Sequence, residues 1–190
     1  MDPLNQTRLL RRACGFYALL TVAALAWVRL RTGGWMPTSF LAGDVIASLA
    51  WGLATAVVVL ILSSVLMRSN RAFQWLAREL HGVLGKVDIT TAASLAISSA
   101  IGEELFFRAA MQPVLGYGLT SVLFGLLHVG PNRRYLVWTV SAIAVGFALG
   151  GILLATGNVL GAILAHGLIN FINLLRIGRR HTHDTGAQAA

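Results

Sequence analysis

Three ionisable side chains stand inside an otherwise apolar stretch at residues 101–108, IGEELFFR. On a helix, Glu103 and Glu104 point about 100° apart, so they cannot serve one partner equally. Glu104 and Arg108 are spaced i, i+4 with the acid first, which is the better orientation for an ion pair, and we expect them to clamp the helix. Glu103 is then left without a charged partner on another face. A carboxylate of that kind inside a membrane or a dry core is a candidate general base.

Two further pairs of residues interrupt apolar runs at helical spacing. Phe124 and His128 share one face of their segment, and His166 and Asn170 share one face of theirs. Either histidine alone could be an ordinary packing residue. Counted from the nearest helix break, however, Glu103 and both histidines lie about nine or ten residues, or about 14 Å, from the same side of the membrane. The sequence therefore predicts one shared site formed by a glutamate and two histidines.

The composition is that of a membrane protein. The 190 residues are 56% hydrophobic and 12% charged, with a mean hydropathy of +0.73, whereas soluble domains carry roughly 25% charged residues. The net charge is +8, but the arginines form short clusters between apolar runs, which is typical of loops that face anionic lipid. Nucleic-acid binding is therefore excluded, and the single cysteine, Cys14, excludes an internal disulfide.

The apolar runs predict the elements that must position these side chains. They predict an all-α, polytopic membrane helical bundle that forms one integral membrane domain over residues 1–190, with about six transmembrane helices. The stretch 71–85 places its apolar residues on one helical face, which predicts an amphipathic helix at the membrane interface, although a packed surface helix would show the same pattern. The tail 179–190 is expected to be disordered. The expected spans are 13–30, 45–67, 89–112, 114–129 (shorter than the others), 135–156 and 157–175.

The basic residues set the expected topology. If the spans alternate, most Lys and Arg residues fall on one side, and only Arg29 and Arg31 fall on the other. The positive-inside rule then places both termini in the cytoplasm. A Gly-Pro break follows His128 directly, and irregular backbone at membrane depth is tolerated only where it lines a cavity. We therefore expect the site to open towards the cytoplasmic side.

Taken in order, three motifs resemble those of the CAAX protease and bacteriocin-processing (CPBP) family, which comprises intramembrane endopeptidases related to the CAAX prenyl endopeptidase. The resemblance covers about 87–175, which would be the catalytic core. The motifs are Glu103-Glu104-x-x-x-Arg108, Phe124-x-x-x-His128 and His166-x-x-x-Asn170.

This resemblance implies a role for each matching residue. Glu103 would activate water with His128 as its partner, and Glu104 would support the site. His166 and Asn170 would polarise the scissile carbonyl and stabilise the tetrahedral oxyanion. The chemistry of these side chains permits these roles, because histidine and asparagine are suitable oxyanion donors and a carboxylate–imidazole pair can take and return a proton.

Two interpretations of the chemistry remain open. Glu103, His128 and His166 would suffice to hold zinc with one open position for water, but the chain has no His-Glu-x-x-His motif, and we favour a glutamate-type protease without a cofactor.

The expected substrate is a membrane-associated protein or peptide: a sorting tail, a leader peptide or a prenylated tail. The expected location is the bacterial inner membrane, and the oligomeric state is not predicted. The alternatives are a non-catalytic binding or immunity protein that uses the same pocket, and a small proton-coupled carrier.

Overall fold

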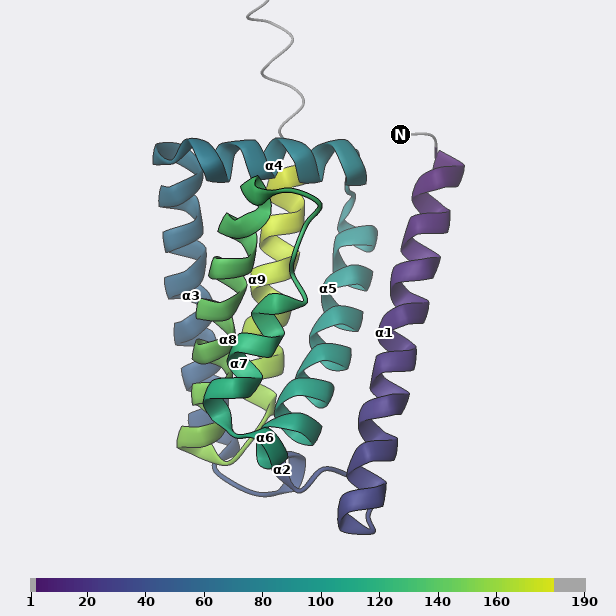
Figure 1. Ribbon diagram of the computed structural model, residues 1–190, viewed down its shortest axis with the longest axis vertical. Helices are drawn as coiled ribbons and strands as arrows, with labels where there is room; N and C mark the ends of the chain where they lie inside the picture. Colours follow the sequence, from purple (N-terminus) through teal and green to yellow (C-terminus); the bar gives the residue numbers. More distant parts are fainter. Residues whose placement is uncertain (1–2, 180–190) are drawn as a thin grey trace, which may run out of the picture.

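The computed structural model describes residues 3–179, whose regular secondary structure is all helical, with no strand among them. Figure 1 shows the long helices running side by side, with α4 lying across one end of the bundle. This arrangement confirms the prediction of an all-α polytopic bundle. The helices are α1 (Pro3–Thr32), α2 (Thr38–Leu41), α3 (Val45–Ser69), α4 (Arg71–Leu84), α5 (Ile89–Glu104), the π-helix η1 (Leu105–Met111), α6 (Gln112–Leu115), α7 (Tyr117–Leu126), the 3-10 helix η2 (Arg133–Tyr135), α8 (Leu136–Thr156) and α9 (Leu160–Gly178).

Four of the described helices are long and apolar enough to cross a membrane: Gln6–Thr32, Val45–Ser69, Arg133–Thr156 and Leu160–Gly178. They coincide with four of the six expected spans. The expected span 89–112 is made of α5 continued by η1, and the expected span 114–129 contains the end of α6 and the 10-residue helix α7. The estimate of about six is thus refined to four full spans, one composite segment and one short helix.

Local sequence signals explain where several helices begin and end. Asp44 accepts a hydrogen bond from the Ala47 backbone N–H at 2.9 Å, and Asp88 accepts one from Thr91 at 2.6 Å, so each aspartate caps a helix N-terminus. Gly157 ends α8 with a φ of 68°, a left-handed conformation that side chains rarely adopt.

Glycine allows the central helices α3 and α9 to touch. A Cβ atom on Gly161 would overlap the Ser48 carbonyl oxygen, and one on Gly52 would overlap the carbonyl oxygen of Gly161. Small residues of this kind are what lets helices pack closely inside a membrane, where no hydrophobic force drives them together. The contact fixes the position of α9, and with it His166 and Asn170.

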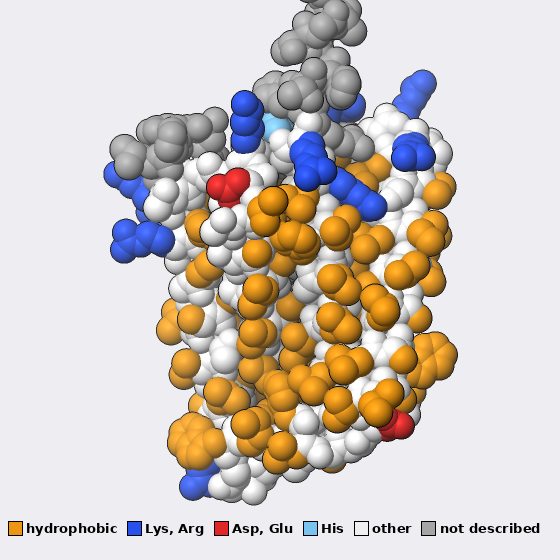
Figure 2. Space-filling model, turned by 180° about the vertical axis from the view of Figure 1, so that it is seen from behind, with side chains coloured by type: hydrophobic (Ala, Val, Ile, Leu, Met, Phe, Trp, Pro, Cys, Tyr) orange, Lys and Arg blue, Asp and Glu red, His pale blue; other side chains and the backbone are white. Residues whose placement is uncertain are grey.

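Helix α4 is the predicted amphipathic helix. Leu76 and Ala77 are buried beneath it, the His81 Nδ1–H donates to the Ile177 carbonyl at 2.9 Å, and the Trp75 ring meets Tyr135 edge-on at 5.2 Å. The helix is therefore packed on the end of the bundle as well as amphipathic. Figure 2 shows Lys and Arg gathered at this same end, around a broad apolar belt. Residues 180–190, most of the tail for which disorder is expected, lie outside the described residues.

Candidate active site

Glu103 faces two histidines in the interior of the bundle. Its Oε2 atom lies 3.9 Å from Nε2 of His128 and 3.9 Å from Nε2 of His166. Glu103 and His166 are buried, while 21% of the His128 side chain is exposed. The three residues come from α5, from the turn after α7 and from α9. The structure thus brings together the glutamate and the two histidines that the sequence singled out.

Hydrogen bonds orient the His128 ring. Its Nδ1–H donates to the Phe124 carbonyl at 2.8 Å, and because a carbonyl can only accept, this bond fixes the tautomer of the neutral ring. Nε2 of the neutral ring is then unprotonated, and its lone pair faces Glu103. The Thr139 hydroxyl donates to the His128 carbonyl at 3.0 Å, and the Trp138 ring lies edge-on to the imidazole at 5.4 Å.

Glu104 binds Arg108 and His166 together. Its Oε2 lies 3.1 Å from Nε of Arg108, and both side chains are fully buried. The His166 Nδ1–H donates to Glu104 Oε1 at 2.7 Å. The predicted clamp is therefore present, and it also holds the second histidine. Arg108 donates further to the Gly146 carbonyl at 2.9 Å, which ties the clamp to α8.

The Phe124 ring is the common support of these groups. Its centroid lies 4.9 Å from that of His128 and 5.9 Å from that of His166. The Arg108 guanidinium lies 4.4 Å from the same centroid, a cation–π distance. Phe124 is 2% exposed, so its ring fills the space between the clamp and the two imidazoles and limits their movement.

Arg108 belongs to the π-helical segment η1, directly after the two glutamates. Single π-helical turns inside α-helices are rare and are frequent at functional sites. No residue in the stretch marks the change from α to π geometry, so the sequence could not predict it.

Asn170 lies one turn beyond His166 on α9. Its Nδ2 donates to the Ser99 hydroxyl at 3.0 Å, and Ser99 lies one turn before Glu103 on α5. The amide is half-buried, and its second N–H is not used by this bond. The structure therefore places Asn170 beside the glutamate–histidine cluster, bound to the helix that carries Glu103.

Two neighbours of the cluster were missed from the sequence. Trp138 and Thr139 on α8 contact His128. Tryptophan near a span end is typical of an interfacial anchor, and a lone threonine in an apolar helix has no motif around it. These side chains carried no signal that could have found them.

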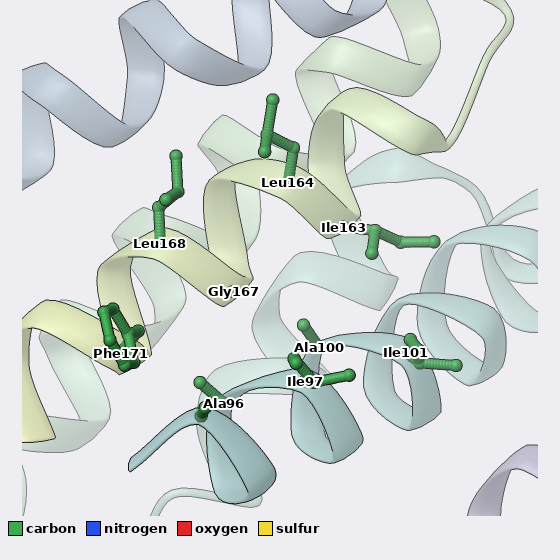
Figure 3. Close-up of a pocket in the computed structure, with 10 residues that line it drawn as sticks. Ala96, Ile97, Ala100, Ile101, Ile163, Leu164, Gly167, Leu168 and Phe171 are labelled. Atoms are coloured by element: carbon green, nitrogen blue, oxygen red, sulfur yellow. The ribbon is translucent and has the colours of Figure 1, made fainter. Parts of the chain in front are cut away.

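An apolar cavity of about 380 Å³ lies between α5 and α9. Figure 3 shows its lining, which comes from one face of each helix and includes Ala96, Ala100, Ile163, Gly167 and Phe171. None of the glutamates or histidines described above lines it, and Ile97 and Ile101 at its edge are exposed. The cavity opens at the surface of the bundle and is separate from the polar cluster.

The cluster matches zinc in ligand type and departs from it in spacing. Tetrahedral zinc with bonds of about 2.1 Å holds its ligand atoms roughly 3.4 Å apart, and the two distances from Glu103 are 3.9 Å. Residues 3–179 contain no group of three His, Cys, Asp or Glu side chains arranged to hold a metal ion. To bind zinc, Glu103 and the two histidines would have to move closer together.

Comparisons with known proteins bear on the family that the three motifs resemble. Residues 86–172 match the model of the type II CAAX prenyl endopeptidase Rce1-like family. The uncharacterized protein YpbD of Bacillus subtilis (strain 168) is 26% identical over 145 residues, which cover 70% of this chain and 73% of that protein. No solved structure matches the chain. The resemblance carried by the three motifs is thereby confirmed: the chain is an integral membrane protein, and its residues 86–172 are similar to the Rce1-like type II CAAX prenyl endopeptidases.

Proposed function

We propose that this protein is a glutamate-type intramembrane endopeptidase that hydrolyses a peptide bond in a membrane-associated protein or peptide. The observation that carries the proposal is the position of Glu103, whose Oε2 lies 3.9 Å from Nε2 of two histidines held by other bonds. The family match supports a protease at family level. The catalytic mechanism is inferred from the positions of the groups around Glu103.

The space between these three atoms suits a water molecule. A separation of 3.9 Å is too long for a direct hydrogen bond, but one water can lie about 2.8 Å from each atom. That water would donate one hydrogen to Glu103 and the other to Nε2 of His128, so that a lone pair is left for attack.

The reaction then balances in two steps. The water oxygen bonds to the scissile carbonyl carbon while its proton passes to Glu103, which acts as the general base. When the tetrahedral intermediate collapses, the C–N bond breaks and the proton on Glu103 is delivered to the leaving nitrogen. The products are a new carboxyl terminus and a new amino terminus.

The oxyanion would be stabilised by His166 and Asn170. The buried Glu104 carboxylate accepts from Nδ1 of His166, an arrangement that stabilises the ring with a second proton on Nε2. That Nε2–H, together with the second N–H of Asn170, would donate to the developing oxyanion. Glu104 and Arg108 therefore act on the reaction through His166.

The substrate would reach the site from the basic end of the bundle. Residues 127–132 are not helical, and Figure 1 shows this connection rising from α7 towards α4. We propose that it lines the entrance, that this end faces the cytoplasm of a bacterial inner membrane, and that both termini lie there. Sorting tails, leader peptides and prenylated tails are all membrane-associated substrates of the required kind.

A survey of protein termini in membranes tests the activity. Cells carrying the wild-type protein are compared with cells carrying Glu103→Gln, which removes the base and keeps the shape, and with Glu79→Gln, the same change at an exposed position of α4. We expect new termini with the wild type and with Glu79→Gln, and their loss with Glu103→Gln. Identical termini in all three, with each protein stably inserted, would favour the non-catalytic binding or immunity function.

The zinc alternative has its own test. Purified protein that cleaves its substrate is analysed for metal and is treated with a chelator. A glutamate-type enzyme retains its activity without bound metal. One equivalent of zinc, together with loss of cleavage on chelation and its return on adding zinc, would establish the metal-dependent mechanism instead.

A further inference from the structure

Ser99 carries a buried hydroxyl at the contact between α5 and α9. Its side chain is 4% exposed, and it lies one turn before Glu103 on the same face of α5. Its Oγ atom accepts a hydrogen bond from Nδ2 of Asn170 at 3.0 Å. This bond therefore joins the helix that carries the proposed base to the helix that carries both proposed oxyanion donors, His166 and Asn170.

The other hydrogen bond of Ser99 determines which atom of the Asn170 amide can face it. The Ser99 hydroxyl donates its single hydrogen to the Ala96 carbonyl, one turn earlier, at 3.2 Å. Towards Asn170 it therefore presents an oxygen lone pair, which can only accept. A turned amide would place Oδ1 against this lone pair, and the two acceptors would have no hydrogen between them. Ser99 thus selects the orientation in which the amide nitrogen faces α5.

The apolar cavity between α5 and α9 gives the amide no alternative partner. Ala100 and Phe171, which follow Ser99 and Asn170 in the chain, both line this cavity (Figure 3). Among the described residues, those that line it have no polar side chain. The last torsion of an asparagine side chain has broad minima. Without the bond to Ser99, the amide is therefore free to turn.

The orientation of this amide matters because an oxyanion needs a donor. In the proposed reaction, the second N–H of Asn170 donates to the developing oxyanion together with Nε2–H of His166. Because the amide is planar, holding one N–H at Ser99 also fixes the direction of the other. A turned amide would present Oδ1 in its place, and the partial negative charge on that oxygen would oppose the negative charge of the transition state.

We propose that Ser99 is a positioning residue for the reaction: its hydroxyl accepts from Asn170 and holds the amide with an N–H, and not the carbonyl oxygen, towards the oxyanion. The inference rests on the proposed function of Asn170 as an oxyanion donor. Ser99 acts through that amide and does not touch the reacting atoms. It lies outside the three motifs, one helical turn before the first of them.

Nuclear magnetic resonance of the purified protein tests this contact without any substrate. The protein is made with isotope-labelled asparagine, and the two side-chain N–H signals of Asn170 are identified by their loss in Asn170→Ala. Ser99→Ala removes the proposed acceptor. Ser98→Ala is the matched control, because that hydroxyl donates to the Ser94 and Leu95 carbonyls of its own helix. We expect one Asn170 signal to move in Ser99→Ala and neither to move in Ser98→Ala.

A second variant keeps the test decisive if Ser99→Ala does not fold. Ser99→Cys keeps the side chain close to its original size and replaces the hydroxyl by a thiol, which is a weaker acceptor. The same Asn170 signal should move in the same direction and less far. Unmoved Asn170 signals in every folded variant of Ser99 would overturn the proposal.

Kinetics provide the functional readout. Ser99→Ala should lower kcat roughly tenfold with little change in KM, because a misdirected donor weakens transition-state stabilisation and leaves substrate binding intact. Ser98→Ala should leave both constants unchanged. In an Asn170→Ala background, Ser99→Ala should have no further effect, since the residue through which it acts is gone. An equal loss in both backgrounds would show a purely structural role for Ser99.

The Ser99 proposal and the endopeptidase proposal fail separately. A moved Asn170 signal in a protein that never cleaves any substrate would support the contact and count against the endopeptidase. Cleavage by the wild type, with unmoved Asn170 signals in Ser99→Ala, would overturn the role of Ser99 and leave the endopeptidase supported.

Discussion

Replacing Arg108 by methionine is expected to destabilise the fold more than removing the whole buried ion pair. Arg108 and Glu104 are 3.1 Å apart with no exposed area on either side chain, so the methionine variant leaves a carboxylate charge in the interior with only His166 beside it. An uncompensated buried charge of this kind costs about 3–5 kcal/mol of unfolding free energy.

Further contacts add to that loss. The Gly146 carbonyl loses the N–H that lies 2.9 Å away, which costs about 1–3 kcal/mol when the group stays buried. The double variant Glu104→Gln with Arg108→Met carries no buried charge, and glutamine can still accept from His166. We therefore expect the double variant to recover most of the 3–5 kcal/mol and to retain only the cost at Gly146.

Equilibrium unfolding in mixed SDS–detergent micelles measures these differences. Arg29→Met is the matched control, because Arg29 is exposed at the end of α1, and its loss should change the unfolding free energy by no more than about 0.5 kcal/mol. A cost of less than about 1 kcal/mol for Arg108→Met, or a double variant no more stable than Arg108→Met alone, would contradict this expectation.

Three further predictions concern the support, the entrance and the packing of the site. Phe124→Leu should reduce the cleavage rate roughly tenfold in an inserted protein, because both histidine rings lose their shared support; an unchanged rate in a cleavage assay would contradict this. In a background without the native cysteine, Val129→Cys should react with a water-soluble maleimide and Leu154→Cys should not, although the two positions are 60% and 67% exposed; equal labelling would argue against an aqueous entrance. Gly161→Ala should lower the unfolding free energy by more than about 2 kcal/mol, because its Cβ overlaps the α3 backbone, whereas Gly167→Ala meets its nearest atom at 3.7 Å and should have little effect; similar unfolding curves for the two variants would show that α3 and α9 are not in close contact.

The residues of the polar cluster could be found from the sequence because ionisable groups are costly in an apolar segment and therefore rare there. The i, i+4 spacing of Glu104 and Arg108 is local information, and the ion pair it predicts is present. Equal depth in three spans indicated that Glu103, His128 and His166 would meet, and they do. Their catalytic roles remain predictions.

Other features of the site depend on contacts between distant segments. The bond between His166 and Glu104 joins α9 to α5, and no spacing rule relates two residues on separate helices. Helix α1 packs directly on α5 at Gly102, where a Cβ atom would come within 2.8 Å of the Tyr17 carbonyl oxygen. The Gly-Pro break that follows α7 was visible in the sequence. The π-helical turn after Glu104 was not, because no residue there marks it.

Hydropathy and helical periodicity are properties of consecutive residues, so the amino-acid order alone shows that this is a helical membrane protein and which residue types gather in its interior. The pairing of these residues depends on tertiary contacts: Glu104 with Arg108 and His166, His128 with the Phe124 carbonyl, and Glu103 with the two histidines. These pairings follow from how close the helices come and how each is rotated about its axis. Packing at glycines such as Gly161 and Gly102 sets both quantities, and it involves residues that the chain keeps far apart.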